Sequence, residues 1–327
     1  MKKLVLFLFT LALGATIFVQ NASAVGGVTV TNPTNVTPNL TATYPTLAAA
    51  ITALNLSTAI SGQVIITLSG PETAPAGGYA ITAVPAGISA TNNIIIQGSS
   101  STITAFTPQA TGGAASCFDA IFKLVGTSWI TIKSFYLVEN TGNTIITPGT
   151  ANNMTEFGVL LVHSSATVGC QNNTIQNNTI SLNQTYTNSV GIFSTSASSS
   201  VNATLLATST AGTNSNNNIY GNLISNVAQG IVFICPPITA TVFETGNDIG
   251  GTSAATQNGI TFGNATASSG PWNLSQSTVQ AGIYFRNGAG NNIRYNTVTS
   301  SSAAYVGSGG LNGIMYTSSA APAGSTL

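Results

Sequence analysis

From about residue 157 the chain repeats a short pattern in which a glycine precedes a branched apolar residue. The pattern is Gly-φ-x-φ, where φ is apolar and x varies, and this alternation with a period of two predicts short β-strands. The copies begin at Gly158, Gly191, Gly230, Gly259, Gly282 and Gly313. We expect each glycine to occupy a corner of the chain, because glycine accepts backbone conformations that other residues avoid.

A second repeated pattern, Asn-x-Ile-x-x-Asn-x-Ile/Val, lies between the glycine copies. It spans residues 173–180, 217–224 and 291–298, and a degenerate copy begins at Asn247. Asparagine tolerates the left-handed conformation of sharp corners, and its amide can bond the equivalent asparagine of the next repeat. The asparagines interpreted as corner residues are Asn173, Asn177, Asn217, Asn222, Asn292 and Asn296.

The two patterns together describe a coil of two or three short strands separated by turns. One coil cannot bury its apolar side, whereas stacked coils share a continuous core. Ile219 occupies the same place in its copy as Ile175 and Ile293, so we predict that it points into that core. The expected fold is all-β, a stack of parallel coils.

The chain before residue 60 predicts a cap for the first coil. In the segment Pro45–Asn55, the residues Leu47, Ala50, Ile51 and Leu54 form a helical apolar stripe. Pro45 suits the first helical position, and the helix would hide strand edges that otherwise recruit other chains. Strands are expected after it at residues 63–68, 79–84, 93–97, 102–106, 121–125 and 129–138.

The N-terminus predicts export. Lys2 and Lys3 precede an apolar stretch over residues 4–19, and Ala22-Ser23-Ala24 suits signal-peptide cleavage. No later stretch is long and apolar enough to span a bilayer. We therefore expect a signal peptide (residues 1–24), an extension with the capping helix (25–59), the repeats (60–317), and a tail or truncation point (318–327).

These motifs resemble the right-handed parallel β-helix of the pectin-lyase-like superfamily, over about residues 60–317. The opening 44–51 and 62–68 is similar to the start of large exported β-helix proteins on Bacteroidetes-type cell surfaces. The resemblance implies a right-handed parallel β-helix, or solenoid, that is secreted or held at a bacterial surface. It does not imply an activity, because this superfamily contains lyases, hydrolases and non-catalytic surface proteins.

Charge restricts the chemistry. Charged residues are 4% of the chain and the net charge is +0, whereas an ordinary chain is about 25% charged. Without a basic stripe, nucleic acid is excluded as a partner. A polysaccharide lyase or hydrolase needs acidic residues held close together, and the sequence has no Asp-Asp or Asp-x-Asp pair. We expect no clustered carboxylates, no metal and no cofactor.

The weak catalytic candidates are two acids and two arginines. Glu244 and Asp248 are four residues apart, and Asp248 is interpreted as filling an asparagine corner position. Arg286 and Arg294 flank successive strands of one coil and could face one side, but a solvated or loop-pairing role is favoured for them. The single histidine, His163, follows a predicted strand and is interpreted as a surface residue.

Four tyrosines near the C-terminal end are the candidates for ligand binding: Tyr284, Tyr295, Tyr305 and Tyr316. Exposed tyrosines on a flat sheet suit stacking of sugar rings. Tyrosine is also simply favoured in strands, and the sequence leaves both interpretations open.

Cysteine spacing gives little information. Cys117, Cys170 and Cys235 are far apart, odd in number and not in a metal-binding spacing. The sequence leaves open one disulfide or three buried thiols.

Two functions remain open. The favoured one is an exported, non-catalytic β-helix protein that binds or adheres to a polysaccharide or cell-surface glycan. The alternative is a polysaccharide lyase or glycoside hydrolase. The last pattern, at Gly313, is followed by no amphipathic helix and no charge, so we also expect self-association through an open C-terminal end.

Overall fold

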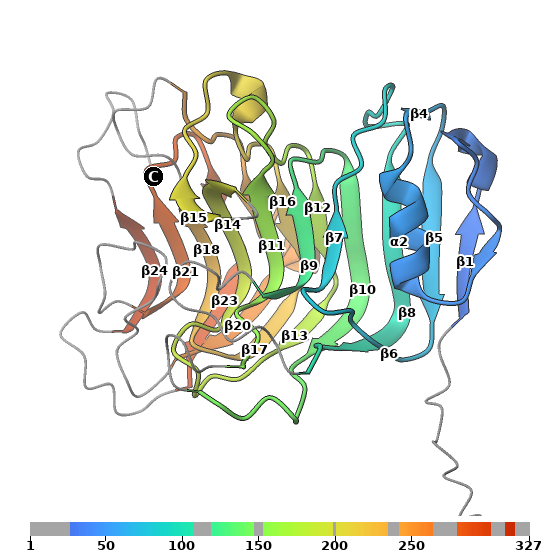
Figure 1. The fold of residues 1–327 in the computed structure, drawn as a ribbon. Helices are drawn as coiled ribbons and strands as arrows, with labels where there is room; N and C mark the ends of the chain where they lie inside the picture. The colour runs from blue at the N-terminus through green and yellow to red at the C-terminus, as the bar shows by residue number, and fades with distance from the viewer. Residues whose placement is uncertain are drawn as a thin grey trace, which may run out of the picture.

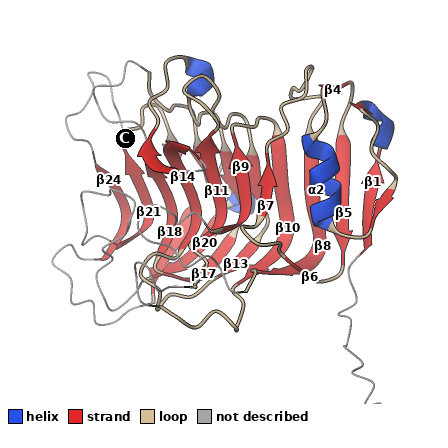
Figure 2. Cartoon of the chain, in the orientation of Figure 1, coloured by secondary structure: helices blue, strands red, loops and turns tan. Residues whose placement is uncertain are grey.

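Two long β-sheets dominate the computed structural model, which describes residues 27–107, 119–146, 153–198, 201–234, 242–263, 280–301 and 311–317. Within these residues, one sheet has fourteen strands and the other has eight. We call them the long sheet and the short sheet. Figure 1 shows their strands lying side by side in chain order, and Figure 2 shows how little of this part of the chain is helical.

The strands form three parallel rows, which the chain visits in a fixed order. The first row, in the long sheet, is β5 (Val64–Ser69), β8 (Ile94–Thr104), β10 (Ile130–Val138), β12 (Thr174–Gln176), β16 (Asn218–Tyr220), β19 (Asp248–Ile249) and β22 (Asn292–Ile293). The second row, in the same sheet, is β6 (Glu72–Thr73), the later parts of β8 and β10, β13 (Thr179–Ser181), β17 (Leu223–Val227), β20 (Asn258–Phe262) and β23 (Asn296–Ser300).

The third row is the short sheet. It contains β7 (Tyr79–Ile81), β9 (Ala120–Val125), β11 (Phe157–His163), β14 (Val190–Ser198), β18 (Gln229–Ile234), β21 (Gln280–Arg286) and β24 (Leu311–Thr317). A further strand, β15 (Val201–Thr204), pairs with β14 in the antiparallel direction. Three 3₁₀ helices lie in the connections: η1 (Pro33–Asn35), η2 (Thr210–Gly212) and η3 (Ala254–Thr256).

One apolar core runs between the two sheets along the rows. Ile219 is fully buried, and its Cα partners in the neighbouring strands are Ile175 and Ile249. The predicted inward position of Ile219 is therefore confirmed. From the short sheet, Phe233 and Phe285 stack with ring centroids 4.6 Å apart. The same position is apolar in successive strands of a row, so the core continues from each strand to the next.

The repeated glycines have a different role from the one expected. None of Gly158, Gly191, Gly230 or Gly282 is among the residues with positive φ. A Cβ on Gly191 would lie 2.5 Å from Ile224 Cγ2, and one on Gly230 would lie 2.4 Å from Ile260 Cγ2. The corner interpretation is therefore wrong: glycine is needed here because the long sheet's isoleucines press directly against the short sheet's backbone.

The N-terminal part covers both sheets at one end. The strand β1 (Gly27–Thr31) pairs antiparallel with β5 and also with β3 (Thr43–Tyr44), which closes that edge of the long sheet. Beside the short sheet lies α2 (Leu47–Asn55), next to β7 in Figure 1. The Asn55 side chain donates to Ala80 O and accepts from Thr82 N, so the helix occupies the place of a further strand. A separate pair joins β2 (Val36–Thr37) to β4 (Ala59–Ile60).

The helix begins later than the sequence suggested. Thr46 is its N-cap, accepting a bond from Ala49 N, so Pro45 lies before the helix rather than at its first position. The expected stripe is correct, because Leu47, Ala50, Ile51 and Leu54 are all buried. The Glu72 carboxylate accepts from Leu47 N, at 3.0 Å to one oxygen. A negative charge there is favourable against the helix dipole.

Strand boundaries also differ in part from the expectation. The predicted strands 93–97 and 102–106 are one bent strand, β8, and 129–138 is the bent strand β10. The bend in β10 lies at Ser134, which has φ 61°, and the pairing register shifts there. In the following repeats the same bend separates two short strands, such as β12 and β13.

Candidate functional site

Two asparagine ladders run along the long sheet. In the first, Asn173 Nδ2 donates to Asn217 Oδ1, Asn217 Nδ2 to Asn247 Oδ1, and Asn247 Nδ2 to Asn291 Oδ1, each over 3.1 Å. The second ladder joins Asn178, Asn222, Asn258 and Asn296 in the same way. Each inner amide also bonds backbone groups, so the buried amides are satisfied and fix the spacing of successive repeats.

The ladder and the corner use different residues. Left-handed residues directly precede most of the ladder asparagines, and they are Asn172, Asn177, Asn216, Gly221, Gly246, Gly290 and Tyr295. Of the asparagines named from the sequence, Asn173, Asn217, Asn222 and Asn296 are in the ladders. Asn177 is a corner residue with φ 55°, and Asn292 is an exposed strand residue. The interpretation that one residue performs both tasks is therefore wrong.

The long sheet also has an outer face, made of the side chains that alternate with its core residues. Three lines of paired residues form it, all exposed or half-buried. They are Thr131, Thr174, Asn218, Asp248 and Asn292; then Lys133, Gln176 and Tyr220; then Thr102, Tyr136, Thr179, Leu223, Gly259 and Thr297. We call this set the outer face.

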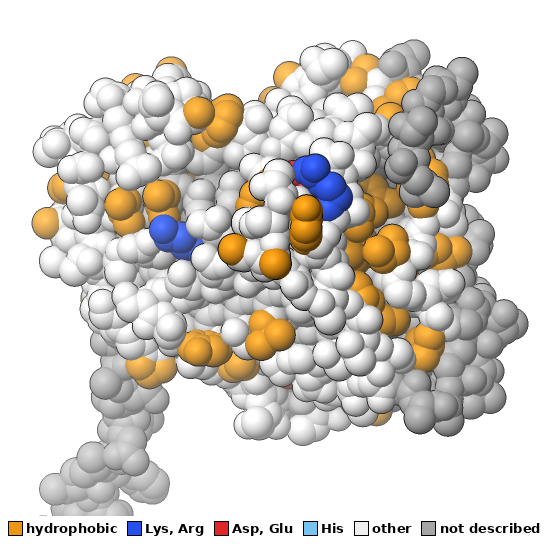
Figure 3. Space-filling model, turned by 180° about the vertical axis from the view of Figure 1, so that it is seen from behind, with side chains coloured by type: hydrophobic (Ala, Val, Ile, Leu, Met, Phe, Trp, Pro, Cys, Tyr) orange, Lys and Arg blue, Asp and Glu red, His pale blue; other side chains and the backbone are white. Residues whose placement is uncertain are grey.

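Apolar groups interrupt the hydroxyls and amides of the outer face at two places. Tyr136 is 42% exposed and Leu223 is 55% exposed. They occupy the same line on either side of Thr179, so strand spacing places them about 10 Å apart. Seen from behind in Figure 3, the molecule shows mostly uncharged polar surface with scattered hydrophobic side chains and few basic ones.

Asp248 and Arg294 pair on this outer face. Arg294 Nη2 lies 3.2 Å from Asp248 Oδ2, and the Tyr220 hydroxyl donates to the same oxygen. Burial and the neighbouring Asp248 charge raise the pKa of Tyr220 to about 12. Asp248 is opposite Asn218 and Asn292, not in the ladder, so its assignment to a corner position is wrong. The pair neutralises itself, which leaves the outer face nearly uncharged.

The other expected catalytic residues lie elsewhere. Arg286 is the last residue of β21 in the short sheet, so it does not share a face with Arg294. Glu244 is fully buried, and His163 Nε2 lies 3.6 Å from its Oε1. His163 is also fully buried, so its interpretation as a surface residue is wrong. It ends β11, in which all seven residues are buried, and this unbroken apolar strand was the signal in the sequence.

The tyrosines do not form one platform. Tyr284 is 3% exposed and its hydroxyl bonds Thr317 Oγ1, whereas Tyr295 is 52% exposed at a corner beside the other sheet. The Tyr316 hydroxyl donates to Gly288 O. Tyr305 lies outside the described residues, as do Cys117 and Cys235. The prediction of an exposed tyrosine is therefore wrong for Tyr284, because its side chain packs in the apolar cluster on the covered side of the short sheet.

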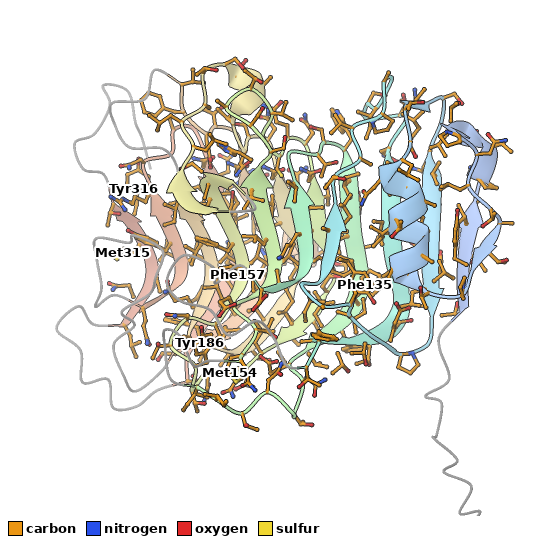
Figure 4. The ribbon with its side chains drawn as sticks, in the orientation of Figure 1. Phe135, Met154, Phe157, Tyr186, Met315 and Tyr316 are labelled. Carbon is orange, nitrogen blue, oxygen red and sulfur yellow. The ribbon has the colours of Figure 1, made fainter. Side chains whose placement is uncertain are left out.

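The structure brings together two carboxyl groups that sequence spacing did not connect. Asp119 and Glu156 directly precede β9 and β11, which pair in parallel with Ala120 opposite Phe157. Asp119 N donates to Glu156 Oε2, and the Tyr186 hydroxyl donates to Glu156 Oε1 over 2.6 Å. The expectation of no clustered carboxylates is therefore wrong. Phe157 and Tyr186 mark the position of this cluster in Figure 4.

Burial governs the electrostatics of this cluster. Glu156 is 0% exposed, and burial followed by the Asp119 charge raises the pKa of its carboxyl well above the ordinary value. Burial lowers the pKa of the nearby Lys123, against the opposing charges of Asp119 and Glu156. Two neighbouring carboxyl groups, one of them with a raised pKa, are the pattern of an acid–base pair. Here, however, Glu156 is fully buried and both of its oxygens already accept hydrogen bonds.

Glu139 anchors the turns beside this cluster. Its carboxylate accepts from Asn140 N, Asn143 Nδ2, and both the backbone N–H and the hydroxyl of Thr155, at 2.8–2.9 Å. Three of these bonds reach Oε1 and one reaches Oε2, so Glu139 holds the turn at Asn140–Asn143 against Thr155.

Within the described ranges, no group of three or more His, Cys, Asp and Glu side chains is arranged to hold a metal ion. In the same part of the chain, no helix is long and apolar enough to cross a membrane. Comparison with protein-family models, with curated proteins and with solved structures finds no match to this chain.

Proposed function

We propose that this chain is an exported, non-catalytic surface protein that binds a neutral glycan on the outer face. The observation that carries the proposal is the exposed position of Tyr136 and Leu223 among hydroxyl and amide side chains on the outer face of the long sheet. Sugar rings present apolar C–H faces and a rim of hydroxyls. Exposed apolar side chains can pack against the C–H faces, and threonine, asparagine and glutamine can hydrogen-bond the hydroxyls.

The charge of the outer face selects among glycans. Lys133 is a single cation on its line, and Asp248 and Arg294 are paired with each other. An acidic polysaccharide needs a row of cations to hold its carboxylates, and these lines of residues do not supply one. A neutral polysaccharide is therefore the proposed partner.

Retention of the protein on insoluble polysaccharides tests the proposal. The exported chain is mixed with cellulose, chitin and xylan, and with pectate as the charged comparison. We expect retention on at least one neutral polymer and none on pectate. Tyr136→Ala and Leu223→Ala should each weaken the retention about fivefold, the value of one good aromatic or apolar contact.

Val84→Ala is the matched control, because Val84 is 54% exposed and lies outside the outer face. It should bind as the unaltered protein does. Absence of retention on every neutral polymer, or equal weakening by Val84→Ala, would reject the outer face as the binding surface.

The architecture we propose is a right-handed parallel β-helix of the pectin-lyase-like kind over residues 60–317. Its support is the passage of the chain through the three parallel rows in constant order, with the ladders repeating along them. Parallel crossovers are right-handed in nearly all proteins. Small-angle scattering that gives a globular rather than an elongated particle would contradict this proposal.

Export is proposed from the N-terminal segment, which lies outside the described residues. Secretion from a bacterial host should yield a chain that begins at Val25, as measured by intact mass.

Self-association through the C-terminal end also stays a prediction. The 53% exposure of Ile314 in β24 is in keeping with it.

The alternative, a polysaccharide lyase or hydrolase, has one observation in its favour, the contact between Asp119 and Glu156. We assign that pair a structural role because Glu156 has no exposed surface. The protein is therefore expected to release no products from pectin, alginate or xylan, with or without Ca²⁺. Product release that Glu156→Gln abolishes would promote the enzyme in place of the binding protein.

A further inference from the structure

A groove lies at the carboxyl end of the second row of strands. Its volume is about 640 Å³, and it is formed by the turn after β10, the turn after β13, and Asn226 of β17. Ligand sites commonly have volumes of about 300–1,000 Å³. The groove is large enough for a short oligosaccharide rather than a single ion.

The groove contains a buried acceptor that lacks a donor. Asn143 lines it and is 4% exposed. The Asn143 side-chain nitrogen donates to Phe106 O and to Glu139 Oε1, at 2.9 and 2.8 Å. Both N–H groups are therefore used, and among the described residues its Oδ1 has no hydrogen-bond partner. A buried amide oxygen of this kind favours a donor supplied from outside the chain.

Across the groove, Asn183 has the opposite character. Its Oδ1 accepts from the backbone N–H and the hydroxyl of Thr185, whereas its side-chain nitrogen has no hydrogen-bond partner among the described residues. The hydroxyls of Ser181 and Thr144 also line the groove. A hydroxyl both donates and accepts, so a polyhydroxylated ligand matches an orphan acceptor and open donors in the same groove.

The groove's charge excludes other ligand classes. The described residues that line it include one carboxylate, Glu139, and no lysine or arginine. Glu139 already accepts four hydrogen bonds from the chain, and a single carboxylate supplies few of the about six to eight oxygen ligands that Ca²⁺ takes. An anionic ligand would meet this negative charge without a cation to compensate. We infer that the groove binds a neutral oligosaccharide, as a site distinct from the outer face.

Binding of soluble tetrasaccharides tests this site. Cellotetraose, xylotetraose, mannotetraose and chitotetraose are titrated by calorimetry and compared with tetragalacturonate. At least one neutral tetrasaccharide should bind and the acidic one should not. Asn183→Asp keeps the oxygen that holds Thr185 but replaces the N–H donors with a charged oxygen. It should weaken binding at least tenfold, and Thr144→Val and Ser181→Val by smaller factors.

Two controls separate this site from the outer face and from nonspecific charge effects. Asn92→Asp adds the same charge in a loop away from the groove, and it should leave binding unchanged. Tyr136→Ala should reduce retention on polymers while leaving tetrasaccharide affinity as it was. Failure of every neutral tetrasaccharide to bind, or equal binding by Asn183→Asp, would overturn the groove site. Loss with Tyr136→Ala would instead place the oligosaccharide on the outer face.

Discussion

Asn173 and Asn217 bond each other through their side-chain amides over 3.1 Å although 44 residues separate them in the chain. The same Asn217 oxygen also accepts from Asn173 N, and Asn217 Nδ2 donates to Cys170 O. One amide therefore ties the segment from Cys170 to Asn173 to the backbone at Asn217 in the next repeat. This arrangement explains why a protein with so few charges can still specify the register of its strands.

Removing a ladder amide should be costly. Asn217→Ala would remove the partner of Asn173 N, of one Asn173 Nδ2 hydrogen and of Cys170 O in a buried place, so we expect the free energy of unfolding to fall by about 3 kcal/mol. Asn292→Ala is the control, because Asn292 is exposed and outside the ladder. It should change stability by less than about 0.5 kcal/mol. Urea titrations in which both variants lose the same stability would contradict the separation of ladder and strand positions.

The core position of Ile219 predicts a second stability difference. Ile219→Ala should cost about 2–5 kcal/mol, through lost burial and the cavity it leaves. Leu223, at the start of the following strand β17, is 55% exposed, so Leu223→Ala should be nearly neutral. Thermal melting measures both, and an unchanged melting temperature for Ile219→Ala would show that the rows do not pack as described.

The glycine contact between the two sheets gives a third prediction. In Gly191→Ala the new methyl would lie 2.5 Å from Ile224 Cγ2 and 2.9 Å from Gly230 O, and overpacking of this kind costs about 1–3 kcal/mol. Gly313 is in the same motif but has nothing within 4 Å of its Cβ position. Gly313→Ala should therefore be neutral or slightly stabilising. Equal destabilisation of the two variants would argue for backbone conformation rather than contact.

Glu156 should make stability depend on pH. Its pKa is raised above the ordinary value of 4.5, so the folded chain keeps a proton that the unfolded chain releases. Stability is then greatest below about pH 4.5 for this group, and it falls as pH rises toward the raised pKa. Glu156→Gln carries no such proton, and its unfolding free energy should fall less over that window. Parallel slopes for the two proteins would show that Glu156 is ionised in the folded state.

Cys170 should be inert in the folded protein. Its thiol donates to Leu124 O and Val162 O, and burial raises its pKa to about 12. Because the thiolate is the reactive form, iodoacetamide at pH 8 should leave Cys170 unmodified until urea unfolds the chain. Mass spectrometry of the Cys170 peptide reads the result, and rapid alkylation under native conditions would mean that this region opens readily.

The sequence by itself determined the inward side of the repeats. Ile219 and the ladder positions Asn173, Asn217 and Asn222 were identifiable because they recur at fixed offsets within short local patterns, and a strand's period of two assigns the face. The α2 stripe was identifiable for the same reason, with a period of 3.6. Local periodicity was therefore enough to predict the strands, the capping helix and the side chains that face the core.

Only the tertiary structure decided the rest. Asp119 meets Glu156 because β9 and β11 pair in one register, and His163 meets Glu244 although 81 positions separate them in the numbering. The local pattern around Gly191 suits a corner, whereas the residue is glycine because Ile224 of the opposite sheet packs against its backbone. These contacts depend on which strands become neighbours in a sheet and on how the two sheets pack against each other. Strand pairing and sheet packing join residues distant in the chain, and no local pattern encodes them.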